Sequence, residues 1–90
     1  MSVRFPLGQT VATPGALEVL ESAGASPLAL LARHQSGDWG DVPLEDATEN
    51  EFSVQKGFRI LSSYRVGPER LWVITEADRS VTTILRPDEY

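Results

Sequence analysis

The pattern of apolar and polar positions changes its period once, at about Phe58. Before this residue, apolar side chains recur at the spacing of helices, and after it they alternate with polar side chains as in strands. Helices followed by strands indicate an α+β domain in which the helices cover one sheet face. Ninety residues suit one domain, so residues 1–90 are predicted to form a single domain.

Three short helices are predicted before the change of period, and a glycine follows each of them. The first begins at Thr13 and Pro14, because threonine can cap free N–H groups and proline is tolerated at the first helical position. Gly24 ends it by supplying a left-handed conformation. The other two helices are expected over 27–35, where Ser26 repeats the start signal, and 44–56.

Three strands are predicted over 58–66, 71–76 and 81–85, with short turns between them. Short connections between successive strands indicate an antiparallel meander. Residues 9–12 are read as a short fourth strand. The predicted fold is therefore three short helices packed on an antiparallel meander sheet of three to four strands.

The last strand, 81–85, is expected to form an edge of this sheet. Exposed edges invite pairing with another chain, which makes a weak homodimer or a partner contact a hypothesis for this strand. Either Trp39 or Trp72 is expected to be largely buried, and Leu28 to share a helix face with Leu31. One hydrophobic core is predicted from Leu17, Leu20, Leu31, Ile60, Ile74 and Ile84.

The composition excludes several kinds of functional site. The chain has no cysteine and one histidine, which excludes disulfides, thiolate zinc sites and a cysteine nucleophile. No motif for a nucleotide, a metal or a serine nucleophile is present, so no cofactor and no metal are expected. No apolar run approaches the roughly 18 residues of a membrane helix, and the N-terminus lacks a secretory pattern. We therefore expect a cytoplasmic protein without membrane contact.

The net charge of −5 argues against direct binding of nucleic acid, because contacts to phosphate dominate such affinity. An acidic chain suits a basic protein partner, or simply remains soluble. The carboxylates expected on the third helix could occupy a basic nucleic-acid channel of a partner: Glu45, Asp46, Glu49 and Glu51. The expected state of the chain itself is a monomer or a weak homodimer.

Two groups of residues are candidates for chemistry. His34 precedes a loop with Asp38, Trp39 and Asp41, where an aspartate beside the ring would favour its protonated form. The ordinary interpretation is a solvated histidine with Trp39 in the core. The second group is a hairpin turn of Glu76, Asp78, Arg79 and Ser80, whose types are also those of ordinary turns. As binding residues we single out Asp38, Trp39, Asp41, Asp78 and Arg79.

Three stretches of the sequence together resemble a family of small uncharacterised bacterial proteins often labelled plasmid-related. They are Val11–Leu17 (VATPGAL), Arg33–Asp41 (RHQSGDWGD) and Ile74–Leu85 (ITEADRSVTTIL), and the resemblance extends from Phe5 to Tyr90. It implies carriage on plasmids, phages or genomic islands, and no assigned activity or catalytic residues. Some members are labelled type I restriction subunits, but ninety residues cannot hold a methyltransferase domain or a specificity subunit.

Two functions from different classes remain open at this stage. The first is a non-enzymatic accessory protein of a mobile element, which binds a protein and inhibits a host defence complex. The second is a small metal-independent ribonuclease or toxin, with His34 as acid, Glu76 as base and Arg79 as phosphate clamp. The second requires the three side chains to converge on one concave surface. We expect no catalytic residue, and so favour the first.

Overall fold

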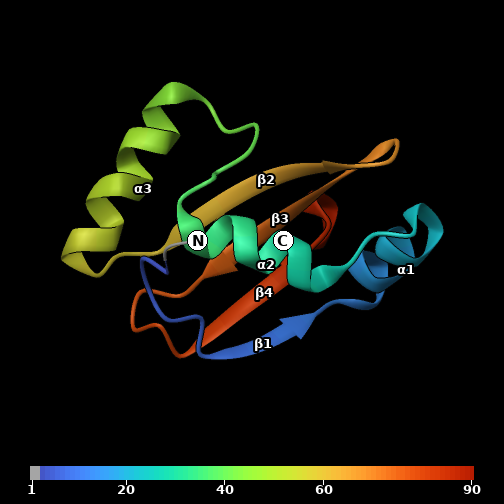
Figure 1. Ribbon diagram of the computed structural model, residues 1–90, viewed down its shortest axis with the longest axis horizontal. Helices are drawn as coiled ribbons and strands as arrows, with labels where there is room; N and C mark the ends of the chain where they lie inside the picture. The colour runs from blue at the N-terminus through green and yellow to red at the C-terminus, as the bar shows by residue number, and fades with distance from the viewer. Residues whose placement is uncertain (1–2) are drawn as a thin grey trace.

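A four-stranded sheet in the order β1–β4–β3–β2 forms the centre of the computed structural model, which describes residues 3–90 (Figure 1). The strands are β1 (Gln9–Ala12), β2 (Ile60–Val66), β3 (Glu69–Thr75) and β4 (Val81–Leu85). Three helices and a final 3₁₀ turn accompany them: α1 (Pro14–Ala23), α2 (Pro27–Ser36), α3 (Leu44–Lys56) and η1 (Pro87–Glu89). The α+β class and the three predicted helices are confirmed.

The sheet is mixed rather than purely antiparallel. The β2–β3–β4 meander is antiparallel, as predicted, but β1 lies beside β4 in parallel, with Gln9 opposite Val81. The prediction that β4 forms a sheet edge is therefore wrong, because β4 is paired on both sides. The two edges are β1 and β2.

The ends of the helices follow local chemistry. The Thr13 hydroxyl accepts a hydrogen bond from the amide of Ala16, as a helix cap does, whereas Ser26 makes no such bond. The carboxylate of Glu89 also accepts from the Thr13 hydroxyl at 2.6 Å and from the amide of Gly15 at 3.2 Å. The segment after β4 therefore helps to fix the start of α1.

The core lies between α1, α2 and one face of the sheet. Residues of β2, β3 and β4 alternate, so that Tyr64, Leu71, Val73 and Ile84 meet the helices. A smaller cluster of Phe5, Trp39 and Ile60 lies beside it, against α3. The prediction that one of the two tryptophans is buried is confirmed by Trp39, which is 6% exposed.

The predicted packing of the core and of the second helix needs three corrections. Leu17 is 52% exposed, because α1 buries Ala16, Val19 and Leu20 instead. Leu28 is 73% exposed, because α2 buries a face that contains His34. Ile60 belongs to the smaller cluster, and Ile74 is buried on the sheet face away from α1 and α2. Of the six predicted core residues, Leu20, Leu31 and Ile84 pack together.

The β2 edge is covered by two segments of the same chain. The side-chain amide of Asn50 on α3 donates to the carbonyl of Leu61 at 2.7 Å and accepts from its N–H at 3.1 Å. Farther along the strand, Ser63 donates to the carbonyl of Trp39 and accepts from the amide of Asp41. These contacts satisfy backbone groups that would otherwise be free to pair with another chain.

Candidate functional site

His34 lies in the core rather than at the surface. Its side chain is fully buried, with Nδ1 2.6 Å from the hydroxyl of Ser62 and Nε2 2.9 Å from that of Thr75. The Thr75 hydroxyl is 2.7 Å from that of Thr82, which donates to the carbonyl of Leu7 at 2.7 Å. Because that carbonyl only accepts, the hydrogen bonds run in one direction from Ser62 to Leu7, and the proton of His34 resides on Nε2.

Burial, with a smaller contribution from the nearby charge of Arg79, lowers the pKa of His34 to about 3. The ring is therefore neutral at physiological pH. The earlier expectation that a neighbouring aspartate would favour the protonated ring is wrong: Asp38 points to Arg33, and its carboxylate lies 2.7 Å from the guanidinium. The rings of Phe5 and Trp39 close the pocket around His34 at centroid distances of 5.2 and 6.0 Å.

The loop after α2 is held by its own polar contacts. Asp38 also accepts from the amide of Gly40 at 3.2 Å, and its pairing with Arg33 lowers the pKa of its carboxyl group. Trp39 is buried and donates its indole N–H to Glu51 at 3.1 Å. Of this group only the carboxylates of Asp38 and Asp41 reach the surface, and Asp41 lies 3.4 Å from Arg70.

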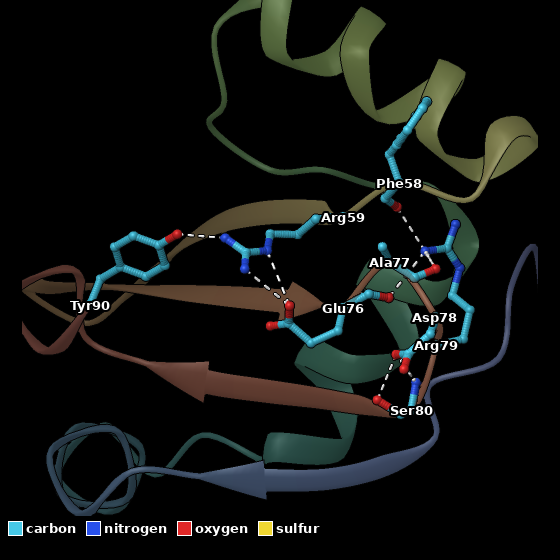
Figure 2. Close-up of polar contacts among 8 residues, drawn as sticks. All are labelled: Phe58, Arg59, Glu76, Ala77, Asp78, Arg79, Ser80 and Tyr90. Carbon is cyan, nitrogen blue, oxygen red and sulfur yellow. Dashed lines mark hydrogen bonds and ion pairs between the residues drawn. The ribbon is translucent and has the colours of Figure 1, made fainter.

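The Glu76–Ser80 turn is shown in Figure 2. Asp78 accepts from the amide and the hydroxyl of Ser80, which is ordinary turn chemistry and lowers the pKa of Asp78. Glu76 pairs with Arg59, whose guanidinium also donates to the hydroxyl of Tyr90 at 2.6 Å. The carboxylate of Glu76 is therefore held in an ion pair with Arg59.

Arg79 serves the backbone of the turn. It is the one non-glycine residue with positive φ among residues 3–90, at +62°. Its guanidinium donates to four carbonyls at 2.7 to 3.2 Å, those of Ser53, Phe58, Glu76 and Ala77. Arg79 therefore ties the end of α3 and the start of β2 to the β3–β4 turn.

We expect Arg79→Ala to lower the free energy of unfolding by about 1–3 kcal/mol, because four carbonyls lose a charged donor. Arg65→Ala is the matched control, since Arg65 is exposed and forms no ion pair among the described residues. Urea unfolding of both variants measures the difference. Equal effects of the two substitutions would contradict the assigned role.

The three residues of the nuclease hypothesis do not form one site. His34 is enclosed between α2 and one sheet face, with both ring nitrogens bonded. Glu76 lies in front of the sheet in Figure 2, while α2 lies behind it, and the donors of Arg79 are occupied by carbonyls. The arrangement offers neither an exposed acid and base pair nor a free phosphate clamp.

A pocket of about 320 Å³ lies between α1 and the β2–β3 turn, with Glu18, Val66 and Arg86 in its lining. Arg86 is already shared between Glu69 and Asp88. The pocket thus contains no unpaired cation for an anionic ligand and no pair of groups poised for proton transfer. We do not treat it as the functional site.

Among residues 3–90, the exposed side of α3 carries three unpaired carboxylates, which were predicted to face a basic partner, and beside them lie two exposed phenylalanines, which were not predicted. Glu45 and Glu49 lie one turn apart, and Phe52 continues the same face. Phe52 is 49% exposed and stacks on Phe58, which is 53% exposed, at a centroid distance of 5.8 Å. We call this the acidic–aromatic surface: Glu45, Asp46, Glu49, Phe52 and Phe58. The available signal in the sequence was Phe52, which follows Glu45 and Glu49 at helical spacing.

The carboxylates of this surface are free of cations within residues 3–90. Glu45, Asp46 and Glu49 take part in no ion pair there, whereas Glu51 is engaged by Arg4 at 2.7 Å. Most arginines are already bound to carboxylates of the chain: Arg4, Arg33, Arg59, Arg70 and Arg86. With four acidic residues and one basic residue, Lys56, α3 has a negative net charge, and few unpaired cations among residues 3–90 remain for a polyanion.

The described residues contain no group of three or more side chains placed to hold a metal ion. None of the helices in that part of the chain has the length and apolarity to cross a membrane. Comparison of the chain with protein-family models, with curated proteins and with solved structures finds no match.

Proposed function

We propose that this chain is a small acidic accessory protein of a bacterial mobile element, which acts in the cytoplasm by binding a host defence complex. The acidic–aromatic surface carries this proposal. Unpaired carboxylates beside an exposed aromatic pair combine electrostatic attraction for a basic groove with apolar contact area. The resemblance of three sequence motifs to plasmid-related proteins supports the mobile-element setting.

The target we propose is the basic nucleic-acid channel of such a complex. The carboxylates of Glu45 and Glu49 are spaced along one helical face, so they can meet successive basic side chains that otherwise contact phosphates. Phe52 and Phe58 would then fill an apolar recess beside the channel. Binding would compete with nucleic acid and thereby inhibit the complex.

The test is a pull-down from a native host with the wild-type chain and two charge-matched variants. Glu45→Gln with Glu49→Gln neutralises two carboxylates of α3, and Glu18→Gln with Glu21→Gln does the same on α1, where both residues are exposed. We expect the α3 variant to recover about tenfold less of a nucleic-acid-binding partner and the α1 variant to recover it normally.

Elution with double-stranded DNA distinguishes channel binding from binding elsewhere. Release of the partner by DNA at constant ionic strength is the expected result. Recovery that is unchanged in the α3 variant, or a partner that DNA does not displace, would contradict the proposal.

A further inference from the structure

The β1 edge of the sheet, unlike the β2 edge, is uncovered. In Figure 1 no other element lies beyond β1 on its free side, and Gln9, Thr10 and Val11 are exposed. The amide of Thr13 bonds to Ile84 of β4, and that of Gln9 to Ser80 just before β4. By alternation, the N–H and C=O groups of Thr10 and Ala12 therefore point outward. No described contact covers this edge as Asn50 covers β2.

An apolar groove runs beside this edge on the side of the helices. It has a volume of about 200 Å³, and its lining includes Ala12, Leu17 and Leu28. Leu17 and Leu28 are 52% and 73% exposed, whereas the side chain of Val11, 40% exposed, lies on the other sheet face together with Thr83. Leu17 was predicted to lie in the core, and Leu28 to share a helix face with Leu31. Exposed leucines gathered beside one groove are typical of a contact surface.

The β1 strand and the groove beside it contain few charged residues, and this property indicates the kind of partner. Residues 5–17 and 22–32 contain no charged side chain, although the whole chain has 13 acidic and 8 basic residues. These two stretches supply β1 and most of the groove. The uncharged lining of the groove gives a basic partner no attraction, and it lets the β1 edges of two acidic copies meet, because charged side chains such as Glu89, which bonds to Thr13, lie beyond the ends of the strand.

We propose that β1 pairs with β1 of a second copy of this chain in antiparallel orientation, which extends the sheet across a two-fold axis. The outward groups of Thr10 face those of Ala12 in the other copy, and Val11 faces its own counterpart at the axis. This register forms hydrogen bonds between both Thr10–Ala12 pairs. Leu17 and Leu28 add apolar contact beside the strands. The interface is separate from the acidic–aromatic surface.

The lack of cysteine in the chain makes a direct test possible. Val11→Cys places one thiol on the axis, where opposed residues of an antiparallel pair lie close enough for a disulfide. We expect it to form a covalent dimer under mild oxidation at least about tenfold faster than Thr10→Cys or Leu44→Cys, because Thr10 faces Ala12 and Leu44 lies on α3.

Sedimentation equilibrium of the wild-type chain is the second measurement, with Val11→Lys as the variant that sets like charges opposite each other at the axis. We expect a concentration-dependent dimer whose dissociation constant rises at least about tenfold in Val11→Lys and is unchanged in Leu44→Lys. A wild-type monomer at millimolar concentration, equal disulfide rates for all three cysteine variants, or a dimer that tolerates Val11→Lys would each overturn the proposal.

Discussion

Replacing Gly40 by alanine is expected to cost about 3 kcal/mol or more of unfolding free energy, although Gly40 is exposed. The residue has a φ of +72°, which is unfavourable for any side chain. An added Cβ would overlap the backbone carbonyl oxygen of Ser63 and lie 2.7 Å from the ring of Tyr64. The backbone cannot move away, because Trp39 and Asp41 on either side are bonded to Ser63.

Gly57→Ala separates the two causes of this loss. Gly57 has a φ of +80°, but an added Cβ there meets no atom within 4 Å. We therefore expect a loss of about 1–2 kcal/mol from the backbone conformation alone. Urea unfolding of both variants gives the comparison. If the two alanine variants had equal stability, the contact with Ser63 would not matter. If Gly40→Ala failed to fold while Gly57→Ala folded, the loss of stability at Gly40 would be larger than we expect and would have the same cause.

The stability of the chain should fall by about 2 kcal/mol between pH 7 and pH 5 because of His34. The pKa of the buried ring is about 3, below its unfolded value of 6.5, so the unfolded chain binds more protons in this window. Stability is therefore fully present above pH 6.5 and is lost as the pH falls toward 3. The chain has one histidine, and every carboxyl group with a shifted pKa is shifted downward, away from this window.

Urea unfolding at several pH values tests this expectation, with His34→Gln as the variant that cannot titrate. Its slope of stability against pH should be close to flat between pH 7 and pH 5, whatever its absolute stability. The NMR signal of the single ring provides a check without any substitution. A ring signal that titrates with a midpoint above pH 5 in the folded chain would refute the assignment.

The local pattern predicted most elements because their signals are local. Thr13 with Pro14 at a helix start, Gly24 at its end and the period-two run after Phe58 each act within a few residues. The place of β1 could not be predicted this way, since its partner β4 lies at the other end of the chain. The sequence of residues 9–12 indicates a strand, but it does not indicate which strand pairs with it.

The candidate site was harder to predict because polarity was read as exposure. His34 belongs to the buried face of α2, and its hydrogen-bond partners come from β2 and β3, which no local spacing relates to it. The nuclease hypothesis needs Arg79 as a phosphate clamp, but four nearby carbonyls occupy its donors. Histidine and arginine can each serve a functional or a structural role. Only the neighbours of His34 and Arg79 in the folded chain show that their roles here are structural.

The pairing of β1 with β4 sets the order in which this chain can fold during synthesis. Until residues 81–84 have left the ribosome, β1 has no strand to join, and α1 and α2 lack the β4 residue Ile84 that completes their core cluster. The nascent chain therefore carries its apolar N-terminal segment unprotected while the rest is made. Long-range closure of this kind slows folding, and it leaves this apolar segment open to aggregation until β4 is present.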